Sequence, residues 1–295
     1  MKETSSVLGH NPLENMALDN TTSLSAAELA IYLILIPLTV WLFFKHGRRA
    51  SLAYIYLTIF ETLRLVAAGL QIHAHSQHTT SKTGAIIDSV GLSPLLLAFS
   101  GFLYELGTYY YSPPSRSSNN RFIVLEEVLV HVGAYTGIAL AAVGGSNLTK
   151  SNPTQSNIDQ AHTLQETGVV LLLLTWIVLV YMCFRLCRAL GQRQQPGIVL
   201  AILLLATACI FVGVRSVYSV VYAFDHSPSV NPITGGFAIK LVLVFLVQLI
   251  AVVALLAVGF LTRNIAAENS TRRTGTYARP EDVEGGTSIP LRSPK

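Results

Sequence analysis

Charged residues are scarce in this chain. They make up 12% of its 295 residues, against about 25% in an average soluble protein. Apolar residues reach 51%. This number of charges cannot cover the surface of a water-soluble protein of this size. The composition therefore excludes an ordinary soluble globule. It favours a protein whose outer surface lies in lipid.

Cysteine is also scarce, and several sequence signatures are missing. The three cysteines, Cys183, Cys187 and Cys209, all fall within apolar segments or at the end of one. A disulfide in an outer loop is therefore excluded, which removes support for receptors that depend on one. The third apolar segment ends at Gly107 without an Asp-Arg-Tyr motif, and the last lacks Asn-Pro-x-x-Tyr. We find no Ser/His/Asp set and no phosphate-binding glycine loop, so no catalytic residue is predicted.

Long apolar segments dominate the rest of the chain. A membrane-spanning helix needs about 20 mostly apolar residues to cross a hydrocarbon core of about 30 Å, and lipid offers no partner for an unpaired backbone group. Seven segments meet this condition: 24–44, 51–72, 85–107, 122–145, 166–185, 198–224 and 237–261. The sequence predicts an all-α polytopic membrane protein, a bundle of seven transmembrane helices. Residues 1–23 are expected to form a short polar tail, and residues 262–295 a disordered one.

The basic residues predict the orientation. Most of the 20 lysines and arginines fall in the first, third and fifth loops and in the C-terminal tail. Excess Lys and Arg mark the cytoplasmic face. The N-terminus is therefore predicted outside or in a lumen, and the C-terminus in the cytosol, in a plasma membrane or endomembrane. Residues 1–23 lack the basic start and short apolar run of a cleaved signal peptide, so the first span is expected to act as its own insertion signal.

Charges inside the spans point to a site, because they are costly in lipid. Glu61 and Arg64 are three residues apart and share a helix face. By the rise along the helices, Asp88 lies level with Arg215 in the outer half. Arg215, Tyr218 and Tyr222 share a face of the sixth span. We predict a polar pocket in the outer half of the bundle, with six ligand-binding residues: Glu61, Arg64, Asp88, Arg215, Tyr218 and Tyr222.

The same charges also fit a purely structural role. Arg64 with Glu61, and Arg215 with Asp88, balance as two ion pairs that hold helices together. The two interpretations are compatible, because a pocket often reuses structural pairs.

A metal site is weakly indicated. His73, His75 and His78 cluster in a predicted outer loop, but no carboxylate or thiol accompanies them, and structural zinc requires four fixed ligands. A solvated loop is favoured, and neither a metal nor a cofactor is predicted. Gly133 and Gly137 form a small-xxx-small pair in the fourth span, which predicts close helix packing.

Several of these stretches resemble one family. They are Ala27 to Tyr32, His46 to Arg49, Phe60 to Arg64 with Gly69 to Gln71, Gly91 to Ala98, and Arg215 to Ser219. Together with the last span they resemble the fungal integral membrane proteins of domain of unknown function seven-seven-zero-two. The resemblance covers about residues 24–262. It implies a fungal origin and a seven-helix membrane bundle, and it brings no activity, substrate or catalytic residue.

Three classes of function remain open. The first is a sensor or handler of a small amphipathic or lipid-like ligand bound in the outer half. The second is an intramembrane enzyme that uses a metal or a carboxylate pair such as Glu61 and Asp88. The third is a membrane scaffold with structural ion pairs. The expected partners are the lipid bilayer, an amphipathic molecule and proteins that contact the cytosolic tail. A nucleic acid is not expected, because the basic residues gather on one side. Glycosylation of Asn20 or Asn147 stays open.

Overall fold

The protein is built from helices that follow one another along the chain. The computed structural model describes residues 20–46, 51–77, 84, 87, 90–110, 119–148, 154–189, 196–225 and 237–275. Throughout these ranges the structure is helical and contains no strand. The elements are α1 (Asn20–His46), α2 (Ser51–Ser76), α4 (Leu92–Tyr110), α5 (Asn119–Leu148), α6 (Gln155–Ala189), α7 (Pro196–Asp225), α8 (Phe237–Ile239), the π-helix η3 (Lys240–Leu246) and α9 (Val247–Gly275).

Six helices are long and apolar enough to cross a membrane. They are Asn20–His46, Ser51–Ser76, Leu125–Asn147, Gln155–Arg188, Gly197–Asp225 and Phe237–Arg263. The third predicted span corresponds to α4, whose apolar part, Leu92–Gly107, is shorter. Just before it, the Gly91 backbone N–H donates a hydrogen bond to the Ile87 carbonyl at 3.1 Å. The protein is therefore an all-helical, multi-pass membrane protein.

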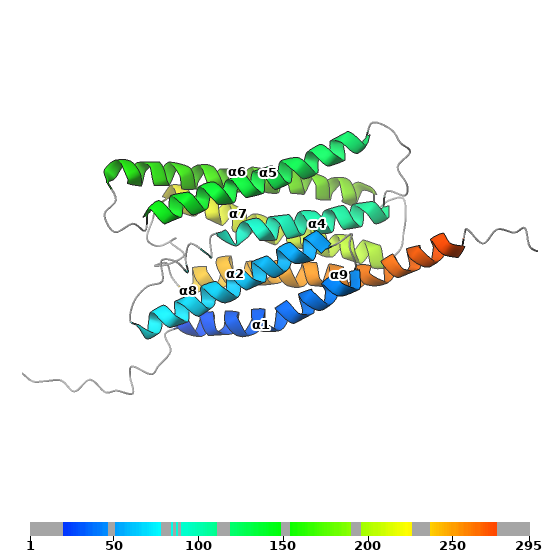
Figure 1. Ribbon diagram of the computed structural model, residues 1–295, viewed down its shortest axis with the longest axis horizontal. Coiled ribbons are helices and arrows are strands. Elements are labelled where there is room, and N and C mark those ends of the chain that lie inside the picture. The colour runs from blue at the N-terminus through cyan, green and yellow to red at the C-terminus, as the bar shows by residue number, and fades with distance from the viewer. Residues whose placement is uncertain are drawn as a thin grey trace, which may run out of the picture.

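The helices lie side by side, with neighbours in the chain running in opposite directions (Figure 1). The closest pairs are α5 with α6, α1 with α2, and α7 with α9. Helices α1, α2 and α9 form one side of the bundle, and α5 and α6 form the other (Figure 1). We call the end at which α1 begins the N-terminal end. Helices α2, α5 and α7 finish there, and α4 and α6 begin there.

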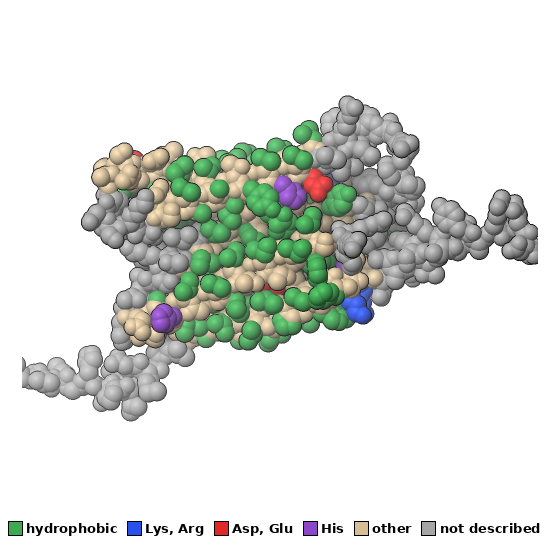
Figure 2. Space-filling model, viewed as in Figure 1, with side chains coloured by type: hydrophobic (Ala, Val, Ile, Leu, Met, Phe, Trp, Pro, Cys, Tyr) green, Lys and Arg blue, Asp and Glu red, His purple; other side chains and the backbone are tan. Residues whose placement is uncertain are grey.

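Apolar side chains face outward along the bundle. Phe44 is 74% exposed and Ile34 65%, and Leu125 and Ile210 are similar. Figure 2 shows hydrophobic side chains covering the visible face between the two ends. In contrast, the centre holds Arg64 and Glu61, which are almost completely buried. Such an apolar exterior fits a lipid bilayer as the surroundings.

Glycines bring α5 and α6 together, as Gly133 and Gly137 predict. A Cβ on Gly137 would lie 3.0 Å from the carbonyl oxygen of Gly168 on α6. A Cβ on Gly168 would lie 2.7 Å from the Ala141 backbone nitrogen. Because the backbones come this close, only small residues fit at the contact, and the prediction of close helix packing is confirmed.

The helices extend beyond the ends of their predicted spans, as α2, α6 and α9 illustrate. Helix α2 continues to Ser76, so His73 and His75 stand in its last turn and not in a loop; His78 lies outside the described residues. Helix α6 already begins at Gln155, and α9 continues past Leu261 to Gly275. Residues 155–166 and 262–274 contain no proline or glycine, so nothing stops these helices where the apolar segment ends.

Candidate functional site

A pocket opens between α4, α5, α6 and α7 toward the N-terminal end of the bundle. Its volume is about 450 Å³ including the open mouth, of which about 20 Å³ can take the centre of a water molecule. The enclosed part is therefore narrow. The lining residues are Leu92, Ala141, Gln165, Val169, Leu172, Arg215, Tyr218, Ser219 and Tyr222.

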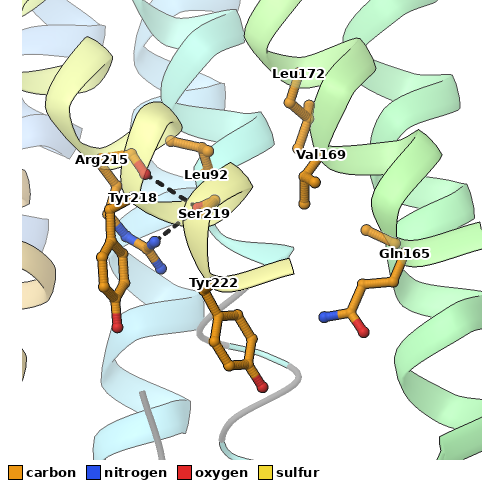
Figure 3. Close-up of a pocket in the computed structure, with 9 residues that line it drawn as sticks. Leu92, Gln165, Val169, Leu172, Arg215, Tyr218, Ser219 and Tyr222 are labelled. Carbon is orange, nitrogen blue, oxygen red and sulfur yellow. Dashed lines mark hydrogen bonds between the residues drawn. The ribbon is translucent and has the colours of Figure 1, made fainter. Parts of the chain in front are cut away.

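The pocket has one polar wall and one apolar wall (Figure 3). Arg215, Tyr218, Ser219 and Tyr222 come from α7, where steps of three and four residues place them on one face. Val169 and Leu172 stand opposite on α6, and Gln165 adds an amide one turn before Val169 on the same helix (Figure 3). The lining therefore combines one charged group and several hydroxyl groups with an apolar wall.

Arg215 supplies the charge of the polar wall. The residue is only 2% exposed. Its Nη1 donates a hydrogen bond to Ser219 Oγ at 2.7 Å, and the guanidinium lies 5.2 Å from the centre of the Tyr218 ring. Arg64 is close enough for its positive charge to act on Arg215. Because Arg64 is itself paired with Glu28 at 3.0 Å, the guanidinium of Arg215 is the group of the pocket that an anionic or acceptor-rich neighbour would meet.

The structure divides the six predicted site residues into groups. Arg215, Tyr218 and Tyr222 line the pocket together. Glu61 and Arg64 are not among its lining residues and lie instead at the interface of α1 with α2. Asp88 lies outside the described residues, so its predicted pairing with Arg215 does too.

Arg64 forms an ion pair with Glu28, which is not one of the six predicted site residues. Its Nη2 donates to Oε1 of Glu28 on α1 at 3.0 Å. The Thr39 hydroxyl of α1 donates to Oε1 of Glu61 at 2.8 Å. Tyr32 lies within electrostatic range of Glu28, Arg64 and Glu61. Both buried charges of α2 are therefore held by α1.

These contacts belong to a row of polar pairs along the two helices, which we call the α1–α2 polar seam. The pairs are Ser25 with Gln71 (Oγ to Oε1, 2.8 Å), Glu28 with Arg64, Thr39 with Glu61, and the rings of His46 and Tyr54 (4.9 Å between centroids). The seam runs from the N-terminal end to the opposite end of the bundle. The sequence carried a signal for it, because residues 25, 28, 32, 39 and 46 recur on one face of α1.

His46 closes the seam at the end opposite to the N-terminal end. Its Nε2 lies 3.1 Å from the Thr262 hydroxyl of α9 and 3.9 Å from Oε1 of Glu105 on α4. Across the described ranges, no three His, Cys, Asp or Glu side chains gather as they would around a metal ion.

Comparison with known proteins gives one match. The model of the family described as Domain of unknown function (DUF7702) matches residues 18–265. No curated protein and no solved structure is significantly similar to the chain.

Proposed function

The chain belongs to the DUF7702 family, as its sequence motifs indicated, and we propose a function from the candidate site because the function of this family is unknown. The protein binds a small amphipathic or lipid-like ligand in the pocket between α4, α5, α6 and α7, and acts as a sensor or handler of that ligand. The polar head of the ligand lies against Arg215, Ser219 and Tyr222. Its apolar body lies along Val169 and Leu172.

One observation carries this proposal: a guanidinium almost without exposure stands in a narrow pocket whose other wall is apolar. A charge inside a membrane protein is costly and usually marks a function. Arginine binds carboxylate and phosphate groups through paired hydrogen bonds. The two walls together favour an amphipathic ligand with an anionic or acceptor-rich head.

The proposal includes a topology of seven crossings. Helix α4 is the seventh, because its 19 residues rise about 28 Å at 1.5 Å per residue. The bias of Lys and Arg places the N-terminal end outside or in a lumen. The pocket then opens in the outer half of the membrane, where it is reached from the outer leaflet.

A stability measurement tests the ligand. The purified protein is heated in detergent with a panel of lipids, sterols and amphipathic drugs. A ligand that binds only the folded state raises the melting temperature with its concentration. Val169→Trp fills the pocket, and Leu174→Trp places the same side chain on α6 at a residue that is 52% exposed.

We expect a shift in the wild type and in Leu174→Trp, and its loss in Val169→Trp and in Arg215→Ala. No shift with any compound, or a shift that Val169→Trp retains, contradicts the proposal. If Arg215→Ala does not fold and no compound shifts the wild type, Arg215 is structural and the scaffold interpretation stands. Stoichiometric zinc in the purified protein, lost in Glu61→Gln or Asp88→Asn, favours the intramembrane enzyme.

A further inference from the structure

Two buried polar side chains near the middle of the bundle leave hydrogen-bonding atoms unused. Glu61 on α2 and Gln248 on α9 are both 0% exposed. Among the described residues, Oε2 of Glu61 and both amide atoms of Gln248 have no hydrogen-bond partner. A buried polar atom without a partner is costly, and such an atom in a folded protein calls for an explanation, such as an internal water.

The contact between Tyr54 and Gly259 is the reference point from which the positions of Glu61 and Gln248 can be counted. A Cβ on Gly259 would lie 2.5 Å from the Tyr54 hydroxyl and 3.3 Å from Cδ1 of Leu42. Helices α1, α2 and α9 therefore meet at this level. Glu61 is two helical turns beyond Tyr54 on the same face of α2, and Gln248 is three turns before Gly259 on the same face of α9. Glu61 contacts Thr39 of α1, and the count of turns therefore assigns Gln248 to the face of α9 that meets α1 and Tyr54.

The two side chains also lie at similar depths. Helices α2 and α9 run in opposite directions (Figure 1), so both steps lead toward the N-terminal end. The step is about 10.5 Å on α2 and about 16.5 Å on α9 at 1.5 Å per residue. The difference of about 6 Å is a span that two long polar side chains and a water molecule can bridge.

We propose that Glu61 and Gln248 form an internal site for a water molecule and a proton. The water donates hydrogen bonds to Oε2 of Glu61 and to Oε1 of Gln248, and it accepts one from Nε2 of Gln248. When Glu61 takes up a proton, its carboxyl O–H donates to the water instead. The Thr39 hydroxyl keeps its bond to Oε1 in both states.

The surroundings select a proton over a metal cation. Glu61 contributes one carboxylate, whereas calcium takes six to eight oxygen ligands. Arg64 stands one turn away on the same helix, and its charge is offset by Glu28 at 3.0 Å. The buried charged and titratable groups on the packed helices are Arg64 and Tyr54 on α2, Glu28, Tyr32 and His46 on α1, and Glu105 on α4. Helix α9 contributes the buried neutral amide of Gln248, and its Arg263 lies over the Trp41 ring.

The backbone of the last helix adds an independent indication. The π-helix Lys240–Leu246 ends two residues before Gln248. π-Helical turns are rare and frequently occur at functional sites. This turn sets the direction of the residues that follow it, Gln248 included. The site lies on α1, α2 and α9 and does not depend on the ligand pocket between α4, α5, α6 and α7.

Infrared difference spectroscopy tests the site. The protein in lipid nanodiscs is titrated between alkaline and acidic buffer, and the carbonyl stretch of a protonated carboxylic acid is recorded. We expect a band from the protonated Glu61 carboxyl group in the wild type, which its loss in Glu61→Gln distinguishes from the bands of the buried Glu28 and Glu105. The band disappears in Glu61→Gln, shifts in Gln248→Leu because the water is lost, and persists unchanged in the control Glu127→Gln.

The contradicting results are equally specific. No band in the wild type, or a set of carboxyl bands that Glu61→Gln leaves unchanged, overturns the proton site. An unshifted band in Gln248→Leu overturns the bridging water. If Glu61→Gln does not fold, Thr39→Val decides. The Thr39→Val variant removes the hydrogen bond to Oε1 of Glu61 and must therefore shift the band. An unshifted band would belong to another carboxyl group and would overturn the assignment of the band to Glu61. Ligand-induced stabilisation is measured separately, so the two proposals can fail independently.

Discussion

Glu28 and Arg64 form an ion pair of 3.0 Å between α1 and α2, where the residues are only 7% and 1% exposed. Arg64 also lies 6.0 Å from the centre of the Tyr32 ring on α1. The pair joins two helices in the interior of a bundle whose exterior is apolar. Removing Arg64 leaves the carboxylate of Glu28 buried without the charge that offsets it.

The first prediction concerns this ion pair. Glu28→Ala and Arg64→Ala are each expected to lower the free energy of unfolding by about 3–5 kcal/mol. The double variant should lose clearly less than the sum, because the two side chains contact each other directly. Unfolding in mixed micelles measures all three. As a control, Glu126→Ala breaks the more exposed pair with Arg185 on α6 and should cost about 0–1 kcal/mol. Additive losses at Glu28 and Arg64 would contradict the ion pair.

The second prediction concerns the contact of α5 with α6. Gly168→Ala should destabilise the protein by about 1–3 kcal/mol, because the added methyl group would lie 2.7 Å from the Gly137 carbonyl oxygen. The matched control is Gly107→Ala on α4, where nothing lies within 4 Å of the new Cβ. That variant should be neutral or gain up to about 1 kcal/mol from helix propensity. Equal melting temperatures of the two variants would show that the close approach is wrong.

Most of the fold could be predicted from the apolar segments, because a membrane span is defined by length and composition alone. The predicted spans correspond to six helices of spanning length and the shorter α4. The helix ends were predicted less well. Hydropathy marks where the lipid ends, whereas a helix ends where the backbone can no longer continue, as at Gly275. The π-helix η3 leaves no periodicity in the sequence that would predict it.

The site could be predicted only where its residues share a helix. Arg215, Tyr218 and Tyr222 followed from spacing along α7, and they do line one pocket. Gln165 was missed because the fifth span was expected to begin at Glu166, which assigned Gln165 to a loop. Glu28 was missed because its pairing with Arg64 depends on how α1 and α2 are aligned with each other. Spacing along one helix does not define that alignment.

The third prediction concerns the position of Arg215 in the pocket. Ser219→Ala removes the hydroxyl that accepts a 2.7 Å hydrogen bond from Nη1. A hydrogen bond to a charged group contributes about 1.5–3 kcal/mol, so we expect ligand affinity to fall by about tenfold or more. The control is Ser216→Ala, because the Ser216 hydroxyl donates to the Val212 carbonyl of its own helix and does not line the pocket. Titration of the stabilising ligand against both variants measures the effect, and equal affinities would contradict the role of Ser219.

The last prediction concerns the number of crossings. Seven crossings place the two ends of the chain on opposite sides of the membrane, whereas six place them on the same side. We expect a cysteine at Ser5 to react with a membrane-impermeant maleimide in intact cells, or in sealed vesicles of the matching orientation. A cysteine at Ser293 should react only after permeabilisation, because the basic loops mark the cytoplasmic face.

The parent protein serves as the control for this labelling, because Cys183 and Cys209 are buried and Cys187 is half-buried. Equal labelling of both ends without permeabilisation, or of neither end, would show an even number of crossings and remove α4 from the spans. Labelling of Ser293→Cys alone would keep seven crossings and reverse the orientation. The pocket at the N-terminal end would then face the cytosol, and its ligand would have to enter from the inner leaflet.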